Sequence, residues 1–508
     1  MTVRFNLLEE PWIPCLRVDG QPIELGVRET LAHAHELREV VGDSPLVTGA
    51  LLRLLLAVLH RVFGPEGYEA WGALWHAGLW DPARLDDYLG QWRERFELFH
   101  PERPFYQAPA SRAKPKSAAS MMHEVASGNN ATLFDHHTEA AGVILRAPVA
   151  ARMLVTSQAF GLAMLGPGEN FVDGPCARGV IFFVSGRTLF ETLMLNLIRC
   201  ADDDPLPEQA GDRPSWEMDD PFLPARTIPL GYLDYLTWYN RRIMLIPEDL
   251  PAGPAVRKIT MGPGLRLDQG VLDPMKSYRQ DVSRGWRPLR FSEHRALWRD
   301  SVALLRLGVP DNRPPRAFDW LAELVAEELV DQEHTVLTLA VGMANDQAKV
   351  DFIRSERLPV PLAYLRNRML VDRLGDALQM AEAVSRQLWG AARRMATLLL
   401  SVDAGDEGAR QPLREDLDRT MAPWGVERSF WSRLEVPFRG MVEALPSGPE
   451  EALERWHRGL VREAWRAFDH AAELIAASPR SLKATVRARD QLAAGLAKAL
   501  PAQAEVVV

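Results

Sequence analysis

Cysteine is scarce in this chain. Its three cysteines, Cys15, Cys176 and Cys200, lie far apart and form neither a CxxC pair nor a Cys/His quartet. This spacing disfavours a disulfide scaffold and a structural zinc site. We expect the three thiols to be small buried hydrophobes in a reducing compartment.

The common catalytic motifs are also missing. The sequence contains no GxSxG, GxxxxGK[ST], HExxH or GxGxxG pattern, so it gives no support for catalysis, and we expect no cofactor. Two clusters carry metal-binding residue types: His136, His137 and Glu139, and the three aspartates that begin at Asp202. Their spacing matches no metal motif, and prolines beside the aspartates are more typical of a solvated turn.

No run of the sequence reads as a membrane span. The most apolar stretch, from Pro45 to Gly64, carries Arg53, His60 and Arg61, so it predicts a buried helix. The N-terminus has acidic residues where a signal peptide would place its apolar segment. We expect a soluble, cytoplasmic protein that does not act on a membrane.

Positive charge is in deficit overall but is locally concentrated. The 508 residues carry a net charge of −9, which disfavours a protein that coats nucleic acid over its whole surface. Residues 253–299 nevertheless contain ten Arg or Lys and four acids, whereas residues 201–220 contain eight acids and one Arg. A basic segment on an acidic chain predicts either one confined contact with a polyanion or a solvated face.

The length and the periodicity predict two regions with an α+β fold. We expect a mixed α/β domain over residues 1–365 and an all-α four-helix bundle over residues 366–508. In the first region, helices are expected at 82–96, 150–163, 188–198, 293–307 and 317–330, with strands at 179–185, 241–291 and 334–354. In the second, they are expected from about 374 to 398 and at 424–445, 449–477 and 479–499.

Two loops are candidates for contact with nucleic acid. The segment SGNNATLF at 127–134 combines small polar groups with an apolar wedge; its candidate contacts are Asn129, Asn130, Thr132 and Phe134. These groups suit phosphates, base edges and base steps, although a simple turn leading into a buried Phe explains them equally well. The short loop with Gly166 and Gly168 brings bare backbone close to a groove, or it simply ends a helix.

Two further features have the chemistry for the same role. Lys258 and Lys276 lie in the basic segment, where either reaches a phosphate or a minor groove if it is not merely solvated. The residues around Gln347, namely Asp346 and Ala348, form the expected tip of a hairpin over 334–354. A rigid hairpin is able to push a polar side chain between bases, although most such tips are plain turns.

Taken in order, these segments resemble the CasA family, the large subunit of the type I-E CRISPR surveillance complex Cascade. The resemblance covers nearly the whole chain and ends in the closing helices. It rests on FNLLEEPWIP at 5–14, RPFYQ at 103–107, SGNNATLF at 127–134, GPG at 166–168 and GMANDQA at 342–348. No one motif is specific, but their order and spacing together are.

The resemblance implies a function in target recognition. A CasA protein reads the protospacer-adjacent motif (PAM) of foreign double-stranded DNA, starts strand separation for the R-loop and recruits a helicase–nuclease. Its implied partners are crRNA, the backbone subunits, the small-subunit dimer and the subunit that binds the 5′ handle. The helical bundle is implied to dock on neighbouring subunits and to help hold the displaced strand.

The resemblance also implies roles for particular residues. Segment 127–134 matches the loop that contacts the crRNA-bearing complex near the PAM, and Gly166 and Gly168 match the glycine loop at the minor groove. Gln347 matches the glutamine wedge. The minor-groove lysine matches Lys258 first and Lys276 second. This chain departs from some members in having only two glycines, around a proline, in the glycine loop.

Two other functions stay open at this stage. One is a metal-dependent nuclease that uses His136, His137, Glu139 and the Asp202 cluster. The other is a purely structural assembly subunit, in which changing Gln347 would have no effect on DNA recognition.

Overall fold

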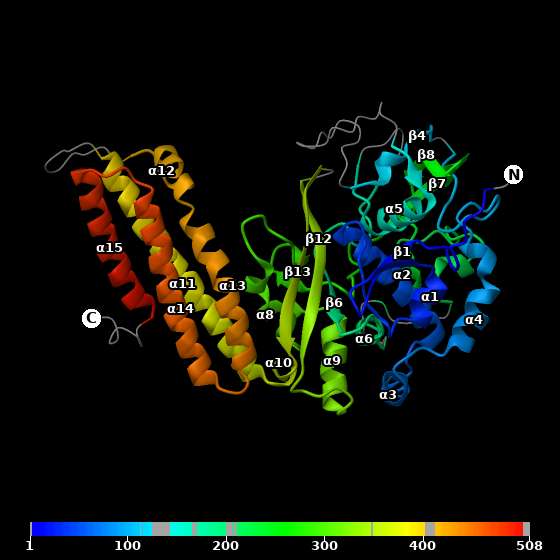
Figure 1. Cartoon of the computed structure of the whole chain (residues 1–508), viewed down its shortest axis with the longest axis horizontal. Helices are drawn as coiled ribbons and strands as arrows, with labels where there is room; N and C mark the ends of the chain where they lie inside the picture. The colour runs from blue at the N-terminus through cyan, green and yellow to red at the C-terminus, as the bar shows by residue number, and fades with distance from the viewer. Residues whose placement is uncertain are drawn as a thin grey trace. The chain divides into compact units, whose positions relative to one another are not determined.

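The computed structural model describes most of the chain as two compact units. The described residues are 3–111, 113–123, 143–164, 170–199, 206, 211–346, 349–401 and 412–500. The mixed unit contains Met1–Leu297, Ala303–Gln332 and Val336–Leu358, and the helical unit contains Trp298–Val302, Glu333–Thr335 and Pro359–Val508. Figure 1 colours the chain from the N-terminus in blue to the C-terminus in red.

The core of the mixed unit is built around helix α2 (Pro45–Phe63). The helix starts with a proline at its first turn, which suits the fixed φ of that residue, and ends at Gly64. It packs against α5 (Ala147–Phe160) and α7 (Tyr232–Leu236). Among the described residues, α2 is the one helix long and apolar enough to cross a membrane, but 78% of that stretch is buried inside the protein. The expectation of a buried helix is confirmed.

Strand β6 (Ile181–Ser185) forms the edge of a three-stranded sheet in the order β13–β12–β6. The partners are β12 (Thr335–Asp346) and β13 (Lys349–Pro361). β12 pairs with β6 in antiparallel fashion, with Val341 opposite Ile181. These pairings confirm both the predicted strand near 179–185 and the predicted hairpin.

A second sheet has β8 (Gly253–Pro263) at its centre, with β7 (Arg241–Leu250) beside it. The other two partners are very short, β4 (Lys116–Ser117) and β5 (Leu145–Arg146). Two small antiparallel sheets contain the other strands found in the described residues. Their strands are β1 (Ile13–Arg17), β2 (Pro22–Leu25) and β3 (Leu37–Val40), and β9 (Tyr278–Asp281), β10 (Gly285–Pro288) and β11 (Asn312–Arg313).

Six shorter helices are also found in the described residues of the first 330 positions. They are α1 (Val27–Ala32), α3 (Tyr68–Ala77), α4 (Pro82–Gln91), α6 (Leu189–Leu195), α8 (Val302–Leu305) and α9 (Arg316–Ala326). Cys15 and Cys176 are buried and unpaired, as expected for small hydrophobes, whereas Cys200 lies outside the described residues.

The predicted helix over 293–307 is wrong. In its place the structure has a single 3₁₀ turn (Leu297–Asp300) followed by the four-residue α8. The ring of Trp298 packs on Phe438 of the helical unit, with centroids 4.5 Å apart, whereas the chain from Ala303 onward belongs to the mixed unit. Residues of this segment are buried in two different units, and one straight helix would not place them in both. Tertiary packing therefore overrides the local helical pattern.

Among its described residues, the helical unit contains four long helices. They are α11 (Arg368–Leu400), α13 (Val426–Ala444), α14 (Pro449–Glu473) and α15 (Pro479–Ala499). α11 packs against the other three, and α13 packs against α14. Two short helices, α10 (Ala363–Arg366) and α12 (Arg414–Met421), were not predicted. The mixed helix-and-sheet fold with a helical C-terminal region is therefore observed.

Candidate nucleic-acid interface

Most of the predicted contact residues lie outside the described part of the chain, but the residues that flank them are described. The residues outside it are Asn129, Asn130, Thr132, Phe134, Gly166, Gly168, Gln347 and Ala348. Asp346 is described only as the last residue of β12. The residues that hold each segment at its two ends therefore define the candidate interface.

Both ends of segment 124–142 are held by the same strand, β8. β4, just before the segment, places Ser117 opposite Lys258. β5, just after it, places Leu145 opposite Val256. The two short strands that flank the segment thus meet β8 on either side of Arg257, next to Lys258.

A β-bulge in β8 turns Lys258 outward. The pairing with β7 shifts at this point: Lys258 lies opposite Ile246, but Val256 lies opposite the next residue, Pro247, which leaves Arg257 as the extra residue. Strict alternation would place Lys258 on the same face as the buried Val256. The bulge resets the alternation, so Lys258 is exposed and the following Ile259 is buried.

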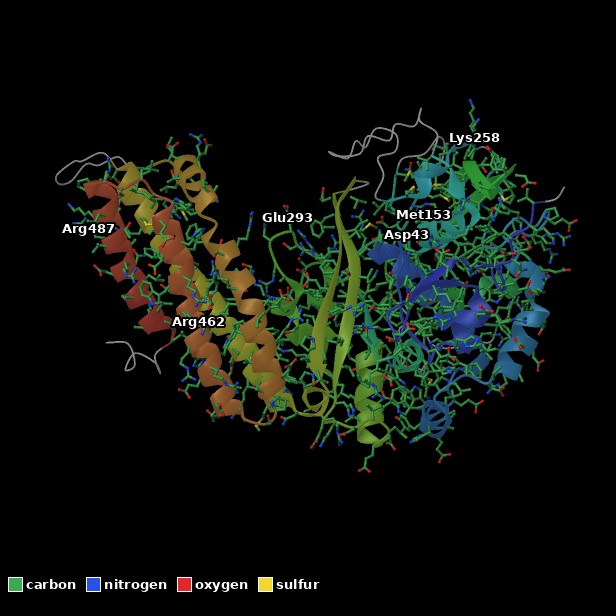
Figure 2. All side chains as sticks on the ribbon, in the orientation of Figure 1. Asp43, Met153, Lys258, Glu293, Arg462 and Arg487 are labelled. Carbon is green, nitrogen blue, oxygen red and sulfur yellow. The ribbon has the colours of Figure 1, made fainter. Side chains whose placement is uncertain are left out.

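The Lys258 ammonium is available to an anion. Its side chain lies at the surface (Figure 2), and it has no ion-pair partner within the described residues. The neighbouring Arg257 is already paired, with its Nε 2.8 Å from Glu248 Oε2. Of the two adjacent cations on β8, Lys258 is therefore the one free to bind a phosphate.

Lys276 is placed very differently. Its side chain is buried, and its Nζ donates to the carbonyl of Pro175 at 2.6 Å and lies 3.8 Å from Asp273 Oδ2. Burial is the largest influence on its pKa and lowers it, against the attraction of Asp273. In this conformation the Lys276 side chain binds to groups inside the protein. Its placement does not favour a minor-groove role, which stays a prediction.

The flanks of segment 165–169 form a closed neck at the C-terminal end of α5. The amide of Phe171 donates to the carbonyl of Met164 at 3.0 Å, and the amide of Gly174 donates to the carbonyl of Gly161 at 2.6 Å. Asp173 Oδ1 also accepts from the amide of Ala163 at 2.8 Å. The two ends of the predicted glycine loop are therefore bonded to each other.

The end of α5 also supports the first loop. Ser157 Oγ donates to the carbonyl of Met121 at 3.1 Å, and His123 Nε2 lies 3.1 Å from the carbonyl of Phe160. Met121 and His123 are the last turn before segment 124–142. One helix end thus carries the base of both loops that the sequence singles out.

The hairpin is joined to the same region through the segment before β6. Gly342 of β12 lies so close to Gly179 that a Cβ added to it would be 3.0 Å from the Gly179 carbonyl oxygen. The residue before Gly179, Arg178, donates from its Nε to Oδ2 of Asp173 at 2.8 Å, and Asp173 belongs to the neck of segment 165–169. In Figure 1, the end of β12, the start of β13 and the sheet with β4 and β8 all lie toward the upper side of the mixed unit.

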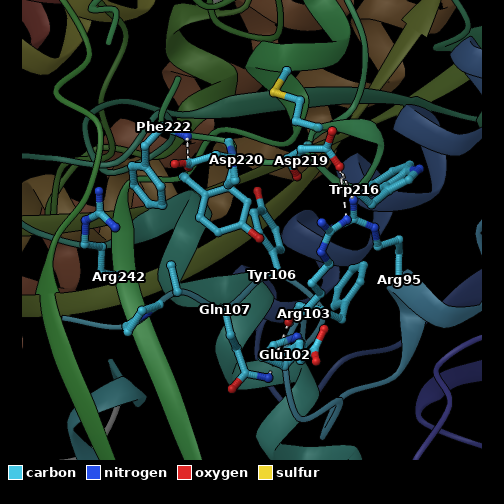
Figure 3. Close-up of a pocket in the computed structure, with 18 residues that line it drawn as sticks. Arg95, Glu102, Arg103, Tyr106, Gln107, Trp216, Asp219, Asp220, Phe222 and Arg242 are labelled. Carbon is cyan, nitrogen blue, oxygen red and sulfur yellow. Dashed lines mark hydrogen bonds and ion pairs between the residues drawn. The ribbon is translucent and has the colours of Figure 1, made fainter. Parts of the chain in front are cut away.

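The RPFYQ motif at 103–107 lines a separate cavity of about 300 Å³. Figure 3 shows its aromatic and charged walls, including Arg95 and Arg103, which both bind Asp219, and Arg242, which stacks on Phe222. The arginines are balanced by acidic residues in the same wall, so the lining favours neither an anionic nor a cationic ligand.

The last residue of the motif has a structural task. Gln107 Nε2 donates to the carbonyl of Leu98 at 2.6 Å, and its Oε1 accepts from the amide of Leu245 at 2.8 Å. Gln107 thereby fixes β7 against the segment before the motif. The motif thus supports the strand pair that carries Lys258 without contacting the interface itself.

No group of three His, Cys, Asp or Glu that could hold a metal is found in the described ranges. His136, His137, Glu139 and Asp202, the residues of the nuclease alternative, lie outside those ranges. The described part of the chain therefore adds no observation that favours a nuclease.

Similarity to known proteins identifies the family of this chain. The sequence profile of the family described as CRISPR-associated protein Cse1 matches residues 6–467. This chain belongs to that family. The curated CasA/Cse1 protein of Thermus thermophilus is 35% identical to it over 511 residues, which is 96% of each chain.

Solved structures of the Cse1 family share the fold. The Cse1 structure from Acidimicrobium ferrooxidans matches with a TM-score of 0.83 at 26% identity and covers 98% of both chains. A chain from a CRISPR RNA-guided surveillance complex matches with a TM-score of 0.76 at 24% identity and covers 96% of this chain and 99% of that one. At that identity the likeness concerns the fold.

Sequence reasoning missed one residue that organises the candidate interface of this Cse1 family member. Arg241, the first residue of β7, is buried and bonds to both flanks of the glycine loop. Nothing local marks it, because an arginine at the start of a strand normally reads as a surface residue. The only signal near it is a set of isolated glycines at 161, 174 and 264, which carry no periodic pattern.

Proposed function

We propose that this chain is the large subunit of a type I-E CRISPR RNA-guided surveillance complex. In that role it recognises the PAM of foreign double-stranded DNA through the minor groove and begins strand separation. It then recruits the helicase–nuclease that degrades the target. Its partners are crRNA and the other Cascade subunits, in the cytoplasm. Membership of the Cse1 family and the fold shared with a surveillance-complex chain support this proposal.

One observation carries the proposed site. The flanks of both candidate loops and the strand that bears Lys258 come together at the end of α5 and on β8. The described flanks of segments far apart in sequence thereby lie close together in one unit. This is the arrangement needed to contact a short stretch of duplex rather than to coat DNA, and it accords with a net charge of −9.

The chemistry of the proposed contacts predicts a permissive reader. In the minor groove, A·T and T·A pairs present the same acceptors, so backbone groups and one lysine accept several related motifs. Sequence is then read by pairing of the guide RNA, as in other RNA-guided effectors. We assign the groove-entering role to Lys258, because its side chain is exposed and has no ion-pair partner in the part of the chain that the structure describes, whereas that of Lys276 is buried.

We assign the wedge to the hairpin tip. Opening the first base pair costs roughly 1–2 kcal/mol of stacking. A side chain such as that of Gln347, carried by two paired strands, offsets this cost by filling the gap and opposing reannealing. No ATP-driven step is required, because later growth of the R-loop exchanges one duplex for another of similar stability.

The decisive experiment is footprinting of duplex DNA by the reconstituted complex, with and without this chain, on PAM and scrambled-PAM targets. PAM-dependent protection that requires the chain supports the proposal. Equal protection without the chain would reduce it to an assembly subunit. Metal content and plasmid nicking are measured on the isolated chain, since stoichiometric metal with cleavage would favour the nuclease.

Two variants assign the roles within the complex. Lys258→Ala should weaken binding to the PAM duplex, whereas Lys498→Ala, a change at an exposed lysine of α15, should not. Gln347→Ala should leave PAM-duplex binding nearly intact and slow R-loop formation. Loss of binding with normal melting would contradict the wedge role of Gln347.

A further inference from the structure

Arg241 has an unusual position for an arginine. Only 2% of it is exposed. Its Nη2 donates to the carbonyl of Leu162 at 2.6 Å, and its Nη1 donates to the carbonyl of Val172 at 2.7 Å. Leu162 precedes segment 165–169 and Val172 follows it, so a single guanidinium joins the two flanks of the predicted glycine loop.

The planar guanidinium suits this task. Its N–H groups point in fixed, divergent directions, so it reaches two carbonyls that one ammonium would not bridge. Nη1 also donates to the backbone carbonyl and to the side-chain oxygen of Asn240. Asn240 Nδ2 in turn donates to the carbonyl of Asp173 at 3.1 Å. The flank after the loop is therefore held from two adjacent residues.

The surrounding backbone leaves just enough room for this contact. A Cβ added to Gly161 would lie 2.7 Å from the Ser157 carbonyl oxygen and 2.9 Å from Arg241 Nη2. A Cβ added to Gly174 would lie 2.7 Å from the Ala159 carbonyl oxygen. Glycine at both positions thus lets the two sides of the neck approach each other and the guanidinium.

Arg241 is also fixed relative to the strand that bears Lys258. Gln158 of α5 brackets its backbone: Oε1 accepts from the Arg241 amide at 2.8 Å, and Nε2 donates to the Arg241 carbonyl at 2.9 Å. Further along β7, Ile246 lies opposite Lys258 on β8. The side chain of Arg241 therefore holds the neck, while its backbone holds the β7–β8 pair.

The guanidinium keeps its charge at neutral pH. Burial lowers the pKa of Arg241 to about 10, against the attraction of Asp173. It forms no direct ion pair with any residue in the described ranges, and its charge is balanced by carbonyl oxygens. Removing the guanidinium leaves the Leu162 carbonyl without this donor, which costs more than the bond itself, and leaves the Val172 carbonyl only its longer bond of 3.4 Å from Asn240 Nδ2.

We propose that Arg241 is a positioning residue that sets the neck of the glycine loop relative to Lys258, so that both meet the same stretch of minor groove. This inference rests on the proposed function and adds a residue that touches no DNA itself. It explains why a polar clamp, rather than apolar packing, is buried at this point.

The test uses Arg241→Lys in the reconstituted complex, with the ratio of affinities for PAM and scrambled-PAM duplex as the readout. The lysine keeps the charge but bonds only one flank. We expect the ratio to fall about tenfold, the size of one lost charge-assisted hydrogen bond. Arg226→Lys is the matched control, because the side chain of Arg226 is only 7% exposed and holds the carbonyls of Pro221 and Pro224 in another loop. It should change the ratio less than twofold.

Two further measurements separate positioning from general stability. Hydrogen exchange on the full chain should show faster exchange of the Phe171 and Gly174 amides in Arg241→Lys and no change there in Arg226→Lys. Gly168→Ala should lower the ratio of affinities for PAM and scrambled-PAM duplex less in the Arg241→Lys background than in the wild type, because both changes act through one loop.

The outcomes are distinct. An unchanged ratio in Arg241→Lys, or an equal fall in both arginine variants, overturns the positioning role and leaves the proposed function intact. A wild-type complex without PAM dependence overturns the proposed function. If exchange of the Phe171 and Gly174 amides were also unchanged in Arg241→Lys, the role of Arg241 in holding the neck would be overturned as well.

Discussion

The two units bury charged groups in different ways. In the mixed unit, Arg152 and Arg241 are buried, and the side chain of Arg226 is only 7% exposed; each bonds to backbone carbonyls of segments distant in the fold or of irregular loops. In the helical unit, the buried Glu463 on α14 is paired with Arg462 and Arg466 of the same helix. One unit uses buried charge to hold loops, and the other keeps its charge pairs local.

The difference follows from what each unit has to hold in place. Regular helices satisfy their own backbone, so an apolar stripe suffices to pack them. Irregular segments leave carbonyls that need donors inside the protein. Where the proposed interface requires loops, the mixed unit therefore uses guanidinium groups, and its stability should depend on a few polar residues.

The largest expected effect tests this dependence on buried charge. Asp273 lies between two buried cations, 3.7 Å from Arg53 Nη1 and 3.8 Å from Lys276 Nζ. Asp273→Asn would leave both without a counter-charge and should lower the free energy of unfolding by about 3–5 kcal/mol. Urea denaturation measures the loss, with Asp268→Asn, a change at an exposed aspartate on the same segment, as the control. Equal midpoints for the two variants would contradict the comparison.

The next effect concerns apolar packing in the helical unit. Leu388 on α11 is fully buried, and Leu388→Ala should cost about 3 kcal/mol through lost contacts and a cavity. Hydrogen exchange should show the loss in α11 and its neighbour α15, with Leu482→Ala on the exposed face of α15 as the control. If Leu388→Ala costs less than 1 kcal/mol, the helical unit does not depend on its apolar stripe.

A smaller effect is expected from acid. Burial lowers the pKa of His60 on α2 to about 3, and its Nε2 has no hydrogen-bond partner within the described residues. The folded chain therefore keeps His60 neutral where the unfolded chain takes up a proton, and stability falls as the pH drops below about 6.5.

Between pH 7 and pH 5 this linkage should cost about 2 kcal/mol relative to His60→Gln. Urea denaturation at both pH values measures it. In the helical unit, partial burial also lowers the pKa of His457, so His457→Gln should show the same sign with a smaller size. A larger loss from His457 would reverse the comparison.

The smallest effect is expected from exposed ion pairs of the helical unit. Arg458 Nη1 lies 2.7 Å from Glu454 Oε1 one turn away on α14, and both side chains are more than half exposed. Glu454→Gln should change the free energy of unfolding by about 0.3–0.5 kcal/mol, and less at high salt. A loss above 1 kcal/mol would show that local charge pairs matter in this unit after all.

The helical unit could be predicted well because its signal is local. The three-and-four spacing from Leu374 to Leu398 lies within α11, and the stop-and-start signals at Gly448 and Ser478 mark the starts of α14 and α15. The mixed unit was predicted less completely. Segment 293–307 has helical periodicity, but its residues are divided between two cores, and no local pattern records that division.

The candidate interface was predictable only as a set of segments. Composition and order pointed to the loops and to the hairpin, but the pairing of β4 and β5 with β8 involves two residues each, too few to leave a pattern. The choice between Lys258 and Lys276 depended on a bulge and on burial. Arg241 was invisible because its partners lie about 70 to 80 residues away.

The closed neck of the glycine loop makes the loop a separable module. Because Met164 and Phe171 are bonded to each other, the fold of the mixed unit needs the neck rather than the residues between its ends. Doubling the length of a flexible loop costs only about 0.6 kcal/mol in closure entropy. Loop variants of other length or composition should therefore be accepted on this neck, which, under the proposed function, offers a route to altered motif preference without rebuilding the protein around it.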